Sequence, residues 1–344
     1  MGGARSTERL AGVDLARALA ALIMVQGHAT HGWIAPESQG PAYAVSRLLG
    51  TFPLPAFLLL AGTSVMLRYA KALRRNEPLS ALARRLRRRG LTLIAVGYGF
   101  SGAMALIDGG GLPSALRADV LQVIGLSIAL ASLLLAPRPA AFVARCASLG
   151  AVAMVVCPLL PVFDLPFVAA AFVGPFVDAP PLTRMPLIPL FAWFAMGIAV
   201  GHWLDLRAAR GQRALALPLA GLAVLLTLGG QWATEWSLAG APLSRQHPAV
   251  LFNVLDLAGR ALAILAAGLF LHRHAGPHLQ RIGLGSLTIY LAHLPFCYGL
   301  FASPFRHRVT MLQAVPLILG LAAFSYGVLR FQELQQKARR APIA

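Results

Sequence analysis

Four ionisable side chains lie inside one long apolar segment near the start of the chain: Asp14, Arg17, His28 and His31 within residues 13–33. A charged side chain at mid-bilayer costs roughly 2.5–3.5 kcal/mol on insertion scales, so each needs a polar partner or water. At about 100° per residue, all four fall within one helical face that is about 100° wide. We expect this face to look into the protein or a wet cavity, with Arg17 and His28 about 16 Å apart along the axis.

These four residues form two chemically different pairs, one of two histidines and one of an aspartate with an arginine. Histidine is the only side chain whose unperturbed pKa suits proton transfer near neutral pH, so His28 and His31 are candidate general bases. Asp14 lies three residues before Arg17 and would offset the cost of burying the guanidinium. The sequence leaves open which histidine is the base.

Three further groups could belong to a site or could be structural. Arg117 and Asp119 enter an apolar segment, where an interfacial arginine and a helix-start aspartate are an equally good explanation. Asp256 and Arg260, spaced i,i+4, fit a structural ion pair better than a site. His293 shares a helical face with Tyr290 and is either a packing residue or a second site residue.

The strongest charge cluster follows the second apolar segment, where five arginines occupy six positions between Arg84 and Arg89. Such a cluster fixes topology and binds anionic lipid headgroups. Alternatively, Arg84, Arg85, Arg87 and Arg88 could hold a phosphate-rich cofactor, because guanidinium groups pair bidentately with phosphate. From the residues alone the headgroup interpretation is favoured.

Composition identifies an integral membrane protein. Of 344 residues, 58% are hydrophobic and 12% are charged, whereas a soluble domain carries about 25% charged residues. The net charge of +18 does not indicate nucleic-acid binding, because the basic residues lie between apolar runs, as the positive-inside rule expects. The three cysteines have no metal-ligand spacing, so we expect neither a metal site nor a disulfide framework.

The apolar runs predict an all-α fold with about ten transmembrane helices, each about 20 residues long. They fall near 13–34, 48–68, 91–107, 118–135, 144–162, 185–204, 214–230, 249–271, 284–302 and 310–330. Little sequence remains between them, so we expect one polytopic domain over residues 1–344. Arginine asymmetry places both termini in the cytoplasm and His28 and His31 towards the outer side of the cell inner (plasma) membrane.

An ordered set of short motifs resembles a known group of enzymes. Arg17 and His28 are separated by ten residues, the R-x10-H spacing of the first helix in the acyltransferase-3 family. The chain also resembles the related heparan-α-glucosaminide N-acetyltransferase-like family. That likeness runs in order through FPLPAFLLLAG, RRLRRRG, LRADVLQVIGLS, PLIPLFAWFAMGIAVG and SLTIYLAHLP.

The resemblance implies a membrane acyltransferase with about ten spans. Such enzymes move an acyl group, usually acetyl from cytosolic acetyl-CoA, to a hydroxyl or amine of a glycan-type acceptor, often across the membrane. It implies that His28 is the catalytic histidine with Arg17 as its partner, and that Arg84, Arg85, Arg87 and Arg88 hold the phosphates of acetyl-CoA. If the chain is instead aligned with the heparan-α-glucosaminide N-acetyltransferase-like family, His31 would be the catalytic histidine. No nucleic-acid partner is expected, and a homodimer is left open.

A transporter or flippase is the main rival, because intramembrane Arg, Asp and His also describe proton-coupled transport. No internal repeat of the kind common in transporters is visible in the sequence. A non-catalytic subunit of a polysaccharide assembly is the third interpretation.

Overall fold

The computed structural model describes residues 10–156, 166, 169, 174–176, 185–239 and 247–340. Within these residues the chain is mainly helical, and an isolated β-bridge pairs Ile34 with Val309. The long helices are α1 (Ala11–Trp33), α3 (Pro53–Arg74), α4 (Leu79–Asp108), α6 (Val120–Leu134), α7 (Pro139–Val156), α9 (Leu187–Leu206), α10 (Gln212–Ala239), α11 (His247–Leu271), α13 (Ser286–Cys297) and α14 (Met311–Arg340). Shorter elements are η1 (Pro36–Ser38), α2 (Pro41–Leu49), α5 (Gly111–Ala115), η3 (Ala208–Arg210), η5 (His272–His274), α12 (Pro277–Leu284) and η6 (Leu300–Ala302).

Each of the ten expected spans coincides with one of these long helices, although residues 157–162 of the fifth lie outside the described part. Among the described residues, seven helical segments are long and apolar enough to cross a membrane. The other three are α1, which carries the four ionisable residues, and α6 and α13, which have 15 and 12 residues. The all-helical, multi-pass class is therefore confirmed, whereas ten crossings remain a prediction.

Close backbone contacts at small residues hold the bundle together. A Cβ on Gly62 of α3 would lie 2.0 Å from the Phe194 carbonyl oxygen of α9, and a Cβ on Gly197 would lie 2.0 Å from that of Leu59. Gly90 of α4 and Gly125 of α6 make a similar approach. Lipid tails are as apolar as leucine, so close packing rather than the hydrophobic effect drives such contacts.

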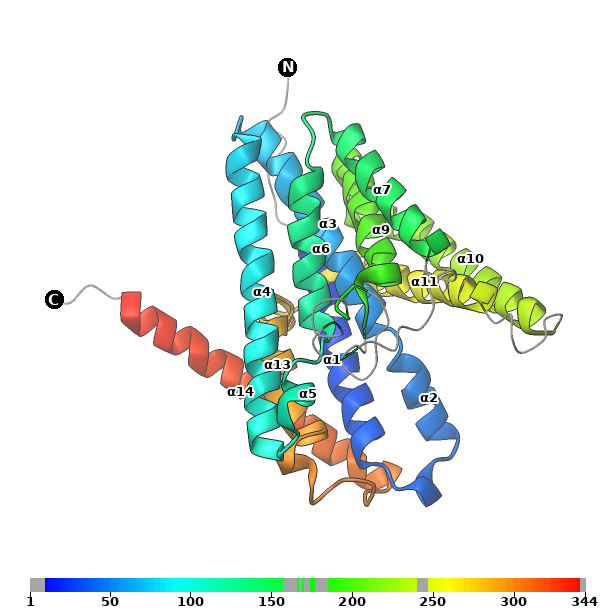
Figure 1. Cartoon of the computed structure of the whole chain (residues 1–344), viewed down its shortest axis with the longest axis vertical. Helices are drawn as coiled ribbons and strands as arrows, with labels where there is room; N and C mark the ends of the chain where they lie inside the picture. Colours follow the sequence, from blue (N-terminus) through cyan, green and yellow to red (C-terminus); the bar gives the residue numbers. More distant parts are fainter. Residues whose placement is uncertain are drawn as a thin grey trace.

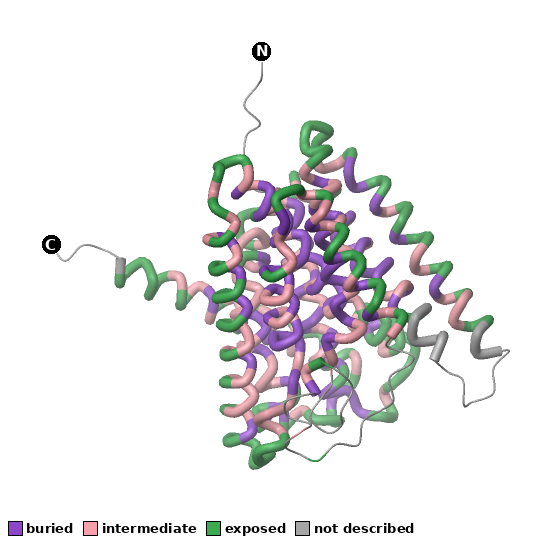
Figure 2. Tube along the Cα trace, turned by 45° about the horizontal axis from the view of Figure 1, so that its top comes forward, coloured by how far each residue is buried: buried purple, intermediate pink, exposed green. Residues whose placement is uncertain are grey.

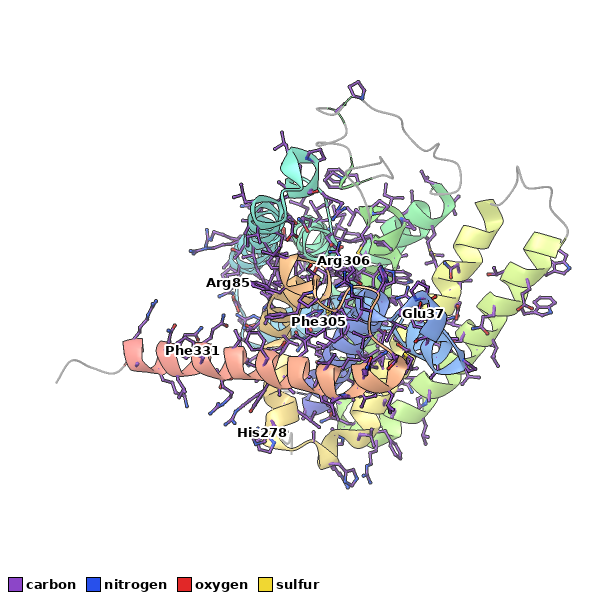
Figure 3. All side chains as sticks on the ribbon, turned by 90° about the horizontal axis from the view of Figure 1, so that it is seen from below. Glu37, Arg85, His278, Phe305, Arg306 and Phe331 are labelled. Carbon is purple, nitrogen blue, oxygen red and sulfur yellow. The ribbon has the colours of Figure 1, made fainter. Side chains whose placement is uncertain are left out.

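The helices form a tilted bundle around a buried centre (Figures 1 and 2). The turn between α3 and α4 and the connection from α6 to α7 lie at the upper end in Figure 1. The connections from α1 to α2 and from α4 to α5 lie at the lower end. Helix α14 runs along one flank, and its C-terminal part, with exposed Phe331, leaves the bundle (Figure 3).

Candidate functional site

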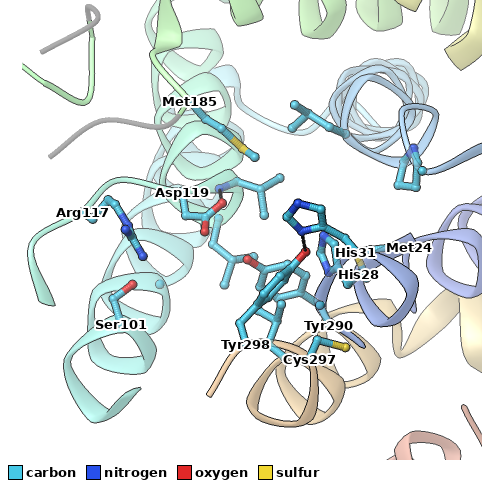
Figure 4. A pocket seen from close by; sticks show the side chains of 18 of the residues that line it. Met24, His28, His31, Ser101, Arg117, Asp119, Met185, Tyr290, Cys297 and Tyr298 are labelled. Carbon is cyan, nitrogen blue, oxygen red and sulfur yellow. Dashed lines mark hydrogen bonds between the residues drawn. The ribbon is translucent and has the colours of Figure 1, made fainter. Parts of the chain in front are cut away.

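A cavity of about 910 Å³ lies between the C-terminal part of α1, the start of α3, the C-terminal half of α4 and helices α6 and α13. His28, His31, Asp119, Tyr290 and Tyr298 are among its lining residues, and Figure 4 shows them converging on one space. All of these elements meet at the end of the bundle opposite the turn between α3 and α4 (Figure 1). The α1 face predicted from helical periodicity therefore does look into a cavity at its histidine end.

His28 and His293 contact each other across 265 residues of sequence. Nδ1 of His28 lies 2.9 Å from Nε2 of His293, whose Nδ1 lies 2.8 Å from the carbonyl oxygen of Ile289. His28 is half-buried and lines the cavity, whereas His293 is fully buried behind it. The sequence left open whether His293 is a packing residue or a second site residue. The structure places it beside the candidate base.

His31 lies one turn further along α1, at the exposed edge of the cavity. Its Nδ1 is 3.1 Å from the hydroxyl oxygen of Tyr298, whose ring also meets the His28 ring edge-on with centroids 5.4 Å apart (Figure 4). No sequence pattern had singled out Tyr298. This residue follows the last residue of α13, so the face periodicity that linked Tyr290 with His293 does not extend to it.

Arg117 and Asp119 both line the cavity from the segment that leads into α6. Asp119 also caps this helix: its Oδ1 accepts a hydrogen bond from the Val120 backbone N–H at 2.7 Å. The Gln122 side chain accepts in turn from the Asp119 N–H at 3.2 Å, which completes a capping box. Asp119 therefore has both of the roles considered for it, as a helix cap and as a polar group on the cavity wall.

Arg17 and Asp14 form the expected ion pair, with Nη1 and Oδ1 2.6 Å apart, and Arg17 also contacts Ser64 of α3. Neither residue is among those that line the cavity. Arg17 precedes His28 by eleven residues, about 16 Å along the helix. The structure therefore does not bring Arg17 to His28, and its visible contacts fasten α1 to α3.

The arginines from Arg84 to Arg88 are exposed on the N-terminal part of α4, where Arg85 pairs with Glu77. None of them is among the cavity residues. The first residue of α4 to line the cavity is Gly97, nine residues after Arg88 and about 14 Å further along the axis. The candidate phosphate site and the histidine site are thus at different heights in the bundle.

Asp256 and Arg260 form the predicted ion pair within α11, with Nε of Arg260 2.9 Å from Oδ1 of Asp256. Arg260 also donates through Nη1 to the Thr51 hydroxyl just before α3, at 2.5 Å. The pair therefore braces α11 against the start of α3, as expected, and Arg260 in addition lines the cavity.

These contacts give the cavity one oriented imidazole beside a space that can hold a sugar-sized molecule. Helix α3 begins on the cavity wall at Pro53, so the positive end of its dipole lies where negative charge could develop. A base and an electropositive helix end are the two groups that acyl transfer to a hydroxyl or amine requires.

Comparison with protein families gives one match, which covers residues 9–238, two thirds of the chain. That family is described as heparan-alpha-glucosaminide N-acetyltransferase, catalytic. No curated protein matches the chain. The matched range contains the histidine-bearing helix α1, the arginines of α4 and the capped start of α6. The chain therefore belongs to the heparan-alpha-glucosaminide N-acetyltransferase catalytic family, a family of membrane acetyltransferases.

Proposed function

We propose that the protein transfers an acetyl group from acetyl-CoA to an amine or hydroxyl of a glycan-type acceptor in the 910 Å³ cavity, with His28 as the general base. One observation supports this proposal above the others. The histidine with the R-x10-H spacing lines a sugar-sized cavity and is held there by a second buried histidine. Basic residues concentrated at the opposite end of the bundle support a cytoplasmic position for that end and an outward-facing cavity.

The proposed reaction uses His28 twice. Its free ring nitrogen takes the proton from the acceptor as the acceptor oxygen or nitrogen bonds to the acetyl carbon. The carbon–sulfur bond then breaks, and the same proton passes to the sulfur of CoA. The start of α3 faces this space and would stabilise negative charge on the thioester oxygen.

Acetyl-CoA would dock at the cytoplasmic end of α4. Arg87 and Arg88 lie three and four residues after Arg84, so both are its neighbours on one exposed face of the helix. Exposed guanidinium groups on one face fit the bidentate recognition of phosphate. The height difference between this face and His28 means that the acetyl end must extend towards the cavity along α4.

A proton-coupled transporter or flippase would use similar intramembrane groups. The family match favours acetyl transfer over this alternative. The seven apolar helices of the described residues imply a lipid bilayer as a further partner. We propose that this bilayer is the cell inner (plasma) membrane.

The direct test is acetyl transfer by the purified protein in lipid nanodiscs. Radiolabelled acetyl-CoA is supplied with an amino sugar or a neutral hexose, and labelled sugar is measured. Wild type should label at least one of them, and His28→Ala should abolish labelling. His278→Ala is the matched control, because His278 is exposed, contacts Tyr326 and does not line the cavity. A wild type that transfers acetyl to neither sugar class in nanodiscs, but moves a sugar across the bilayer of sealed proteoliposomes, would refute the enzyme assignment.

A further inference from the structure

The His28–His293 contact is the first link of a hydrogen-bond chain that ends on a backbone carbonyl. The Ile289 carbonyl oxygen can only accept, so Nδ1 of His293, 2.8 Å away, must carry a proton. In a neutral imidazole the other nitrogen is then an acceptor. Nε2 of His293 therefore accepts, and Nδ1 of His28, 2.9 Å away, must donate.

The geometry of the two rings agrees with this direction. Their planes differ by 15° and their centroids are 5.2 Å apart. That separation equals the 2.9 Å contact plus one ring radius at each end, so the N–H···N bond lies nearly in both ring planes. His293 has no exposed surface, and an unpaired charge in such a place is costly, which favours the neutral form.

We propose that His293 is a positioning residue that holds His28 with its proton on Nδ1, so that the lone pair of Nε2 faces the cavity. An isolated histidine side chain prefers the opposite tautomer, with the proton on Nε2. Without His293, the cavity-facing nitrogen would therefore carry a proton for much of the time and could not act as a base. This inference rests on the proposed role of His28, and it involves a residue outside the family match, which ends at residue 238.

His293 acts through His28, since it does not line the cavity. When Nε2 of His28 takes the acceptor's proton, the ring becomes a cation, and its Nδ1–H remains donated to Nε2 of His293. The chain then stabilises that cation without moving a second proton. A third group that orients the base in this way is a recurring feature of enzymes that use histidine as a base.

Two substitutions separate this role from packing. His293→Gln places a carbonyl oxygen where Nε2 was and can still accept from His28, whereas His293→Phe keeps a ring but has no acceptor. We expect His293→Phe to lower kcat about 10- to 100-fold with KM changed less than about twofold, and His293→Gln to recover most of that loss. Equal activity of wild type and both variants would overturn the proposal, as would a phenylalanine variant that is more active than the glutamine variant.

A second readout does not depend on activity. Nitrogen-15 NMR of histidine-labelled protein in nanodiscs distinguishes the two tautomers, and the His28 signals are assigned from their loss in His28→Ala. Wild type and His293→Gln should show His28 protonated on Nδ1, and His293→Phe should show protonation shifted to Nε2. A wild-type His28 protonated on Nε2 would overturn the proposal. A protein without acetyl transfer but with the Nδ1 tautomer would refute only the proposed function.

Discussion

At the scale of single residues, His28 and His31 share one cavity but differ in what holds them. His28 contacts a buried histidine, whereas His31 is exposed and contacts the hydroxyl of Tyr298. A base must be held in a fixed orientation, so the better-anchored imidazole is the stronger candidate. His31 and Tyr298 are better placed to contact the acceptor at the edge of the cavity.

This difference predicts the order of two substitutions. His31→Ala should reduce kcat/KM about tenfold, mainly through KM, because it removes an acceptor contact rather than the base. His28→Ala should abolish transfer while leaving CoA affinity nearly intact. Steady-state kinetics with both variants and with Tyr298→Phe measure this order. Tyr298→Phe should reduce kcat/KM in the same way as His31→Ala, but by less. If His31→Ala is the inactive variant, His31 is the base.

The residues of the site show what a helical pattern can and cannot reveal. Periodicity correctly placed His28 and His31 on the cavity side of α1, and the R-x10-H spacing singled out His28. The same face also holds Arg17, but a shared direction says nothing about height, and about 16 Å separates it from His28. The contact with His293 depends on how two helices 265 residues apart pack, so no pattern within one segment could reveal it.

At the scale of elements, the contact between α3 and α9 depends on glycines. Gly197 and Gly201 are four residues apart, a spacing typical of close helix packing. In the structure Gly197 meets Leu59, and Gly201 meets Thr63 and Met66. The short helix α2 was not predicted, since its nine residues are too few to give an apolar period. Yet α2 leads directly into Thr51 and the start of α3 on the cavity wall.

We therefore predict that Gly197→Ala destabilises the protein by about 1–3 kcal/mol, as overpacking does. The added Cβ would lie 2.0 Å from the Leu59 carbonyl oxygen, so the two helices must separate. Gly221→Ala in α10 is the control, because a Cβ there meets nothing within 4 Å. Thermal unfolding in detergent should show a lower Tm for Gly197→Ala alone. An unchanged Tm would mean that α3 and α9 are not packed this closely.

The arginines of α4 give a second prediction at this scale. Calorimetry should detect CoA binding that weakens as salt rises, because exposed charges are screened. A triple Arg84→Ala, Arg87→Ala, Arg88→Ala variant should lose most of that affinity. Arg207→Ala, Arg210→Ala is the matched control at the same end of the bundle. If CoA fails to bind wild type at millimolar concentration, the cluster serves anionic lipid headgroups instead.

At the scale of the whole molecule, basic side chains are concentrated at the end of the bundle that holds the turn between α3 and α4. The turn from α3 to α4 and the segments around α12 and η3 contribute Lys71, Arg74, Arg75, Arg84, Arg85, Arg87, Arg88, Arg89, Arg207, Arg210, Arg213, Arg273 and Arg281. Among the described residues, the cavity end has Arg47, Arg117, Arg306 and Arg308, together with Arg260, which is paired with Asp256. The uneven distribution of arginine along the sequence therefore corresponds to an uneven distribution between the two ends of one bundle.

This asymmetry predicts that the cavity faces outwards, and cysteine labelling in intact cells can test it. Glu37 lies exposed between α1 and α2 at the cavity end, and Asn76 lies exposed between α3 and α4 at the arginine end. A cysteine at Glu37 should react with a membrane-impermeant maleimide in intact cells, whereas one at Asn76 should react only after permeabilisation. The background carries Cys157→Ser, and since Cys146 and Cys297 are buried, it should give no signal by itself. The opposite labelling pattern would place His28 on the cytoplasmic side and the α4 arginines outside, where cytosolic acetyl-CoA could not reach them.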